Sequence, residues 1–152
     1  MDSHTVSARV SVQAKPFDAG AEMLALQLPG VGGIGCFVGV VREQGALTAL
    51  TLEHYPGMTE RAIGRITAEA VQRFDLLGCT VIHRVGRLGV GEQIVLVLAA
   101  AGHRKAALEA TEFLIDWLKT RAPFWKREHF ADGSHAWVEA RETDAAAAAR
   151  WT

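Results

Sequence analysis

The sequence contains little cysteine, and its two cysteines form no recognisable pattern. Cys36 and Cys79 lie far apart, each within an apolar run. There is no C-x-x-C motif and no cysteine–histidine spacing typical of a zinc site. We therefore expect neither a metal site nor a disulfide, and we interpret both cysteines as small buried residues of a protein from a reducing compartment.

Long apolar runs and an excess of charge are also missing. No apolar run approaches the roughly 18 residues of a membrane-spanning helix, and the N-terminal segment MDSHTVSARV lacks the apolar core of a signal peptide. The formal net charge is −1, which gives the chain no overall nucleic-acid-binding charge. We expect a cytoplasmic protein that binds neither membrane nor nucleic acid, in which any anion-binding site is local.

The composition is that of an ordinary globular protein, with 49% hydrophobic and 22% charged residues among 152. A chain of this length fits one domain spanning residues 1–152. Helical and strand patterns interleave without strict βαβ alternation, which predicts the α+β class. Residue patterns predict strands at 5–13, 36–41, 49–55, 79–88 and 92–101, an extended segment at 124–130, and helices at 16–28, 59–74 (with Thr59 as its N-cap), 103–121 and 143–152.

The glycine-rich segment 30–35 resembles part of a dinucleotide-binding fingerprint. That fingerprint follows a strand and opens a helix, whereas here the glycines lead into the β-prone run CFVGVV. We therefore interpret Gly30, Gly32, Gly33 and Gly35 as permissive backbone at a strand entry or a bulge.

The segment LKTRAPFWKREHF, residues 118–130, mixes cations with bulky aromatic residues. Pro123 should end the preceding helix, because a proline disfavours helical backbone at the residue before it. Lys119 and Lys126 then belong to two different elements. Burial and neighbouring cations both lower a lysine's pKa towards the neutral range in which general acid/base catalysis operates. The spacing leaves two alternatives open, a solvated helix end and a pocket that holds an anion.

His103 and Arg104 stand at the start of the predicted helix 103–121. Cations at a helix N-terminus are disfavoured by the helix dipole, whereas the free N–H groups there attract anions. These residues are therefore consistent with the binding of an anion, and the alternative is a solvated helix end. Lys119 follows sixteen residues after His103, a rise of roughly 24 Å along one helix. If both ends serve one small ligand, the site must therefore span a dimer interface.

Three further polar residues lie on predicted strands. Arg42 ends the strand after the glycines, and taken alone it is typical of a solvated charge at a sheet edge. His83 and Arg84 are neighbours on the predicted strand 79–88, so their side chains should point to opposite faces. Neither has a partner that the sequence identifies.

Longer blocks of the sequence resemble one known family. FVGVVR, LTLEHYPGMTE, VIHRVGRL, GHRKAALEATEFLIDWLKTRAPFWKRE and WVEARETD are similar to the large subunit of molybdopterin synthase, the MoaE family, over nearly the whole chain. The resemblance implies an α/β-hammerhead fold with an additional antiparallel β subdomain. It also implies a sulfurtransferase of molybdenum cofactor biosynthesis that installs two dithiolene sulfurs on cyclic pyranopterin monophosphate, with no metal or cofactor of its own.

The resemblance implies partners as well. The sulfur arrives as a thiocarboxylate on the C-terminal Gly-Gly tail of a small ubiquitin-like subunit. Two large subunits form a central homodimer within a heterotetramer. A family pocket that draws on both large subunits agrees with the separation of His103 and Lys119.

By matching motifs, Lys119 and Lys126 correspond to the family's catalytic lysines. The resemblance places the following residues at the substrate: Phe37, Arg42, His103, Arg104, Arg127, Glu128 and Arg141. The sequence departs from the family pattern at Val40, where some relatives carry a lysine, and at Gly102, before His103. The alternative function is a non-catalytic anion-binding or scaffold subunit, which would keep the arginines without needing both lysines.

Overall fold

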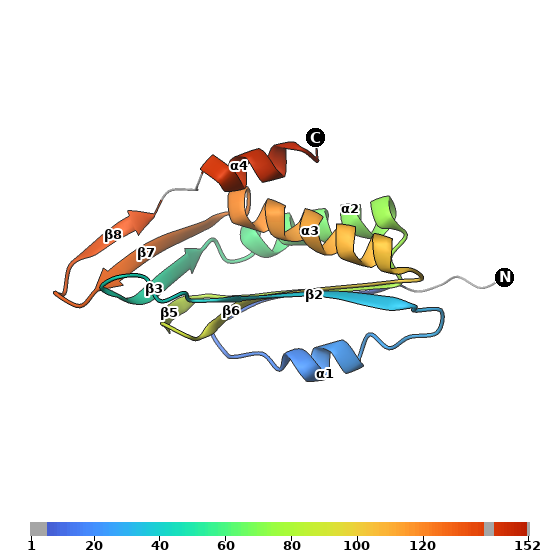
Figure 1. Ribbon diagram of the computed structural model, residues 1–152, viewed down its shortest axis with the longest axis horizontal. Helices are drawn as coiled ribbons and strands as arrows, with labels where there is room; N and C mark the ends of the chain where they lie inside the picture. Colours follow the sequence, from blue (N-terminus) through green and yellow to red (C-terminus); the bar gives the residue numbers. More distant parts are fainter. Residues whose placement is uncertain (1–5, 139–141, 152) are drawn as a thin grey trace.

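The computed structural model describes residues 6–138 and 142–151, which form two four-stranded sheets and four helices (Figure 1). The strands are β1 (Ser7–Gln13), β2 (Gly33–Val40), β3 (Leu47–His54), β4 (Gly78–Arg84), β5 (Gly86–Gly89), β6 (Gln93–Ala101), β7 (Phe124–Phe130) and β8 (His135–Val138). The helices are α1 (Ala19–Leu24), α2 (Met58–Phe74), α3 (Arg104–Thr120) and α4 (Glu142–Ala149). The predicted α+β class is confirmed, and β8 is a strand that we did not predict.

The first sheet has the order β1-β4-β6-β2, in which β1 pairs with β4 in parallel and the other pairs are antiparallel. Helices α2 and α3 cover one face, and α1 covers the other (Figure 1). The central strands are therefore buried on both sides, which explains the continuous apolar run of β6 and the burial of every residue of β4. Val81, Val97 and Leu114 belong to the core under α2 and α3, whereas Leu96 and Leu98 belong to the core on the α1 side.

The second sheet is antiparallel throughout, with the order β5-β3-β7-β8. Our prediction of one strand over 79–88 is wrong, because β4 lies in the first sheet and β5 in the second. β5 begins at Gly86, whose φ of 91° is a conformation that favours glycine. The chain thus passes from one sheet to the other at this point, and His83, near the end of β4, lines a cavity between the sheets.

Helix α2 begins at Met58, so our prediction of Thr59 as its N-cap is wrong. The Thr59 hydroxyl instead accepts a hydrogen bond from the Tyr55 N–H at 3.0 Å and donates one to the Pro123 carbonyl at 3.1 Å. Thr59 is fully buried. It therefore fixes the start of β7 against α2, which helps to position the side chains of β7.

Glycines allow β2 to lie directly beneath α3. A Cβ atom on Gly35 would collide with the Thr111 hydroxyl and the Ala107 carbonyl, and one on Gly33 would lie 3.5 Å from the Arg104 Cα. Gly30, at the approach to β2, has a φ of 87°. The interpretation of permissive backbone is confirmed at Gly30, whereas Gly35 is required by the close approach of the helix.

Candidate active site

A cavity of about 540 Å³ lies where the two sheets meet the C-terminal end of α3. It brings together five of the residues predicted for the site: Phe37, Arg42, Lys119, Lys126 and Glu128. Other residues of β2, β3 and β6, together with Val138 of β8, complete the wall. Pockets of this size accommodate a small organic ligand.

The two lysines reach the cavity from different elements, as predicted. Lys119 lies in the last turn of α3, where a cation suits the helix dipole. The helix ends at Thr120, and Lys126 follows on β7. Because side chains alternate along a strand, Lys126 and Glu128 share the face of β7 that lines the cavity. The structure therefore favours a pocket over a solvated helix end for this segment.

Positive charge predominates at the cavity wall. Arg42, Lys119 and Lys126 contribute three cations, against the single carboxylate of Glu128. The exposed Arg42 guanidinium donates a hydrogen bond of 3.5 Å to the side-chain oxygen of Gln44. Because this hydrogen bond is long and exposed, Arg42 is accessible to a ligand in the cavity. A cavity with this balance suits a ligand that carries more than one negative charge.

His83 also lines the cavity, which the sequence alone did not predict. Its side chain is buried and stacks on the Phe124 ring, with centroids 3.9 Å apart. Nδ1 lies 2.9 Å from the Arg84 carbonyl oxygen. That oxygen can only accept, so Nδ1 carries the proton and Nε2 keeps its lone pair in the neutral ring.

Burial, supported by the positive charges of Lys126, Lys119 and His54, lowers the pKa of His83 to about 3, against the opposing effect of the hydrogen bond to Arg84. His83 is therefore neutral near pH 7 and adds no charge to the cavity. It offers a hydrogen-bond acceptor near the two lysines. In the sequence, its one distinguishing feature is its place on a predicted strand, and the structure shows that β4 is buried throughout.

Arg127 occupies the opposite face of β7 from Lys126 and Glu128. Its guanidinium carbon lies 5.5 Å from the centre of the Trp137 ring, and its Nε is buried without a hydrogen-bond partner in the part of the chain that the structure describes. Arg127 is not among the described residues that line the cavity. Its assignment as a substrate contact stays a prediction.

His103 and Arg104 lie at the far end of α3 from Lys119. His103 is the N-cap residue and Arg104 the first residue of the helix. Neither belongs to the described lining of the cavity, so a single chain does not bring them to the lysines. The predicted contact of Arg141 falls outside the described residues.

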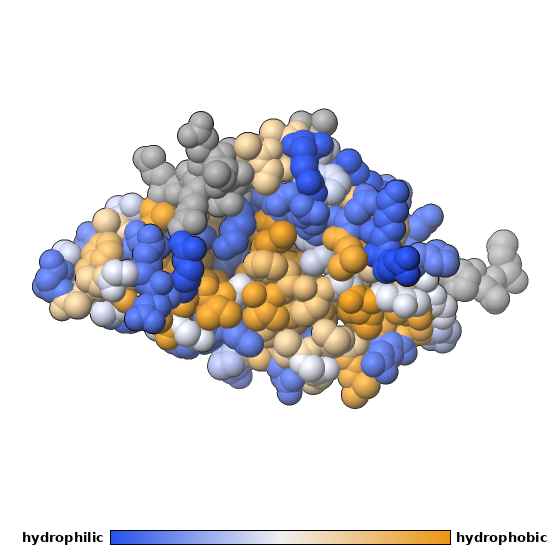
Figure 2. Space-filling model, viewed as in Figure 1, coloured by the Kyte–Doolittle hydropathy of each residue, from blue (hydrophilic) through white to orange (hydrophobic). Residues whose placement is uncertain are grey.

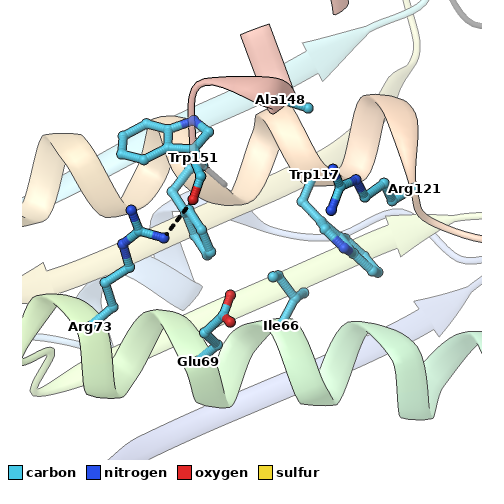
Figure 3. A pocket seen from close by; sticks show the side chains of 8 residues that line it. Ile66, Glu69, Arg73, Trp117, Arg121, Ala148 and Trp151 are labelled. Carbon is cyan, nitrogen blue, oxygen red and sulfur yellow. Dashed lines mark hydrogen bonds between the residues drawn. The ribbon is translucent and has the colours of Figure 1, made fainter. Parts of the chain in front are cut away.

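A smaller cavity of about 190 Å³ lies between α2, α3 and the C-terminal segment (Figure 3). The Arg73 guanidinium donates a hydrogen bond to the Trp151 carbonyl at 3.1 Å, and the Trp151 indole N–H donates to Asp116 at 2.6 Å. Of the predicted site residues that the structure describes, none lines this cavity. We interpret it as the junction at which the C-terminal segment packs on α3.

Within residues 6–138 and 142–151, no group of three or more His, Cys, Asp or Glu side chains is arranged to hold a metal ion. None of the helices described there is long and apolar enough to cross a membrane.

Comparison with known proteins gives consistent matches. The chain is 57% identical over 153 residues to a molybdopterin synthase catalytic subunit of Mesorhizobium japonicum, covering 98% of this chain and 96% of that protein. Its structure is similar to the molybdopterin cofactor biosynthesis protein E of Burkholderia multivorans, with a TM-score of 0.81, 48% identity and coverage of 95% and 97%. It is also similar to a molybdopterin synthase structure from Staphylococcus aureus, with a TM-score of 0.78, 26% identity and coverage of 84% and 95%. The profile of the MoaE protein family matches residues 12–121, and the chain belongs to this family.

Proposed function

We propose that this chain is the catalytic subunit of a molybdopterin synthase. It transfers sulfur from the C-terminal thiocarboxylate of a small ubiquitin-like subunit to cyclic pyranopterin monophosphate, and two such transfers build the dithiolene of molybdopterin. The observation that carries the proposal is the convergence of Lys119 and Lys126, from α3 and β7, on one cavity that Arg42 also lines. Membership of the MoaE family supports it independently.

The charge of the cavity suits this chemistry. The cyclic phosphate and the thiocarboxylate are both anions, so a site that admits them together needs several cations. Lysine can donate and accept protons as sulfur adds and the phosphate ester opens, whereas arginine stays charged and can only bind. We assign Lys119 and Lys126 to proton transfer or to orienting the thiocarboxylate, and Arg42 to the phosphate.

The remaining phosphate contacts, His103 and Arg104, are assigned to a second copy of the chain. A homodimer would place the start of α3 from one subunit beside the cavity of the other, which a single chain cannot do. One small subunit at each end of this dimer would complete a heterotetramer, with its Gly-Gly tail entering the cavity. Arg127 and Arg141 are further candidates for contacts to the substrate or the tail.

The alternative is a scaffold subunit that binds anions without catalysing a reaction. Reconstitution separates the two: the protein is mixed with a thiocarboxylated small subunit and the cyclic precursor, and molybdopterin is measured. We expect product from the wild type. Binding of the small subunit without product would favour the scaffold.

Variants at Lys119 sharpen this test. Lys119→Ala should abolish product while binding of the small subunit is retained. Lys119→Arg keeps the charge but cannot exchange a proton near pH 7, so it should also be inactive if Lys119 transfers protons. Lys15→Ala, which removes an exposed lysine far along the chain from the cavity residues, is the matched control and should keep wild-type turnover. Turnover by Lys119→Ala would overturn the catalytic assignment.

A further inference from the structure

His83 is a buried polar side chain at the end of an apolar row on β4. Cys79 and Val81 precede it on the same face of the strand, because side chains alternate, and both belong to the core under α2 and α3. His83 is only 6% exposed, and its ring lines the cavity. A buried polar group costs free energy unless it has a hydrogen-bond partner. A histidine at this position therefore calls for a partner at each ring nitrogen.

One of these partners lies on β4 itself. The Nδ1–H group donates a hydrogen bond of 2.9 Å to the Arg84 carbonyl oxygen, which leaves Nε2 as an acceptor. Among the charged groups that line the cavity, Arg42, Lys119 and Lys126 are donors. An acceptor at this place therefore suits a cationic side chain of the cavity wall.

The distribution of charge on the cavity wall points to β7. Figure 2 shows apolar side chains across the middle of the face along which β2 runs, bordering hydrophilic ones on the β7 and β8 side. The cavity has the same division, because β2 lines it with Phe37 and Val38, whereas β7 contributes Lys126 and Glu128. An ionised carboxylate can only accept hydrogen bonds. On β7, the donor for a histidine acceptor is therefore Lys126.

Phe124 brings His83 close to Lys126. The His83 ring stacks on the Phe124 ring, with centroids 3.9 Å apart and planes 22° from parallel. Phe124 and Lys126 are two residues apart on β7, so their side chains share one face of the strand. The Thr59 hydroxyl holds the carbonyl of Pro123, the residue before Phe124. The start of β7 is thus fixed, and Lys126 is the next residue on the face that His83 contacts.

The charges that face His83 agree with this placement. They are Lys126 from β7, Lys119 from α3, and His54 from β3, which pairs with Phe124. Burial contributes most to the low pKa of His83, and among these charges Lys126 lowers the pKa most. The ring therefore stays neutral near pH 7, and it can accept a hydrogen bond from an ammonium group without repelling it.

We propose that His83 is a positioning residue of the active site, whose Nε2 accepts a hydrogen bond from the Lys126 ammonium group and holds that group at the cavity. The inference rests on the proposed function for the role of Lys126. Lysine carries its charge on a flexible four-carbon stem, so its ammonium group takes many positions unless an acceptor fixes it. A hydrogen bond to a charged group changes such a population by about 10- to 100-fold.

Three substitutions separate the acceptor from the stacking. His83→Gln places an amide near the position of Nε2, His83→Asn places one near Nδ1 only, and His83→Phe keeps a ring on Phe124 without either nitrogen. We expect kcat for molybdopterin formation to fall by about 10- to 100-fold in His83→Asn and His83→Phe. His83→Gln should recover most of the wild-type kcat, and KM for the precursor should stay unchanged. Equal losses of kcat in all three variants, or a raised KM, would overturn the proposal.

Chemical labelling of Lys126 tests the same contact without catalysis. Acylating reagents attack the free amine, so an acceptor that stabilises the ammonium form slows the labelling. At one fixed pH, peptide mass spectrometry should show Lys126 labelled about tenfold faster in His83→Asn and His83→Phe than in the wild type and His83→Gln. The exposed Lys15 is the internal control and should react at one rate in all four proteins. An unchanged rate at Lys126 would contradict the contact.

Nitrogen NMR of His83 covers the case in which its variants do not fold. Lys126→Met removes the donor while keeping a long side chain, and Lys119→Met is the matched control. The Nε2 resonance should move towards that of a free, unprotonated imidazole nitrogen in Lys126→Met and stay in place in Lys119→Met. A resonance that ignores Lys126→Met, or that responds only to Lys119→Met, would rule out the proposed hydrogen bond.

Labelling and NMR do not use catalysis, so the two proposals can fail separately. A protein in which His83 responds to Lys126 but which forms no molybdopterin with its partner and precursor would refute the proposed function alone. An active enzyme in which His83 and Lys126 are independent in both measurements would refute the positioning role alone.

Discussion

A site shared between two subunits predicts a specific outcome when two inactive variants are combined. Lys119→Ala removes a cation at the end of α3, and Arg104→Ala removes one at its start. These positions are separated by about 22 Å of helix rise, at 1.5 Å per residue, so they cannot serve one small ligand within one chain. Each variant alone should therefore lack activity, because both sites of its homodimer carry the same defect.

The heterodimer of the two variants differs from both. One of its sites receives both substitutions, while the other combines the intact Lys119 of one subunit with the intact Arg104 of the other. An isolated heterodimer should therefore show about half of the wild-type rate per dimer, as a two-fold arrangement requires. Co-expression with two different affinity tags, followed by sequential purification, gives this species, and molybdopterin formation is then measured with the small subunit and precursor.

The opposite result is equally clear. If Lys119 and Arg104 of the same chain act together, each site of the heterodimer lacks one of them. Its activity would then not exceed that of the single variants. The two homodimers, carried through the same tags and purification, serve as controls. A heterodimer that is stable but inactive would refute the shared site.

The remaining predictions concern packing and protonation. Gly35→Ala should destabilise the fold by about 1–3 kcal/mol in urea denaturation, because its methyl group would collide with α3. Gly64→Ala on α2 faces open space and should instead stabilise by up to ~1 kcal/mol; equal effects would contradict the close approach of β2. Because burial lowers the pKa of His83 from 6.5 to about 3, its stabilising contribution is present above pH 6.5 and is lost as the pH falls towards 3. Acidification from pH 7 to 5 should then lower the free energy of unfolding of the wild type by about 2 kcal/mol more than that of His83→Phe. Parallel pH profiles of the two unfolding free energies would contradict this prediction. Burial raises the pKa of the Cys79 thiol to about 12, so it should react with a disulfide reagent only as the protein unfolds, and early labelling would contradict its burial.

Local chemistry accounts for the elements that the sequence predicted well. The break at Pro123 and the alternation along 124–130 follow from backbone geometry, and they placed Lys119 and Lys126 on separate elements. The long helix was equally clear from its apolar spacing. The cavity itself depended on the resemblance, because spacing alone left a solvated helix end open.

The errors arise where a distant contact decides the structure. The run 79–88 reads as one strand, but Gly86 directs its second half into another sheet. Thr59 resembles a helix cap, yet its hydroxyl is taken up by the Pro123 carbonyl, 64 positions further along the chain. His83 looked isolated for the same reason, because the Phe124 ring that stacks on it belongs to a strand of the other sheet.

Strand β7 has two faces with different chemistry, and this limits the changes its sequence can accept. Lys126 and Glu128 face the cavity, while Trp125 and Arg127 face away. Inserting or deleting one residue after Pro123 would exchange the two sets while leaving the amino-acid composition nearly unchanged. Natural variation in this segment should therefore consist of substitutions at constant length, and a one-residue insertion should inactivate the protein as completely as losing both cavity residues.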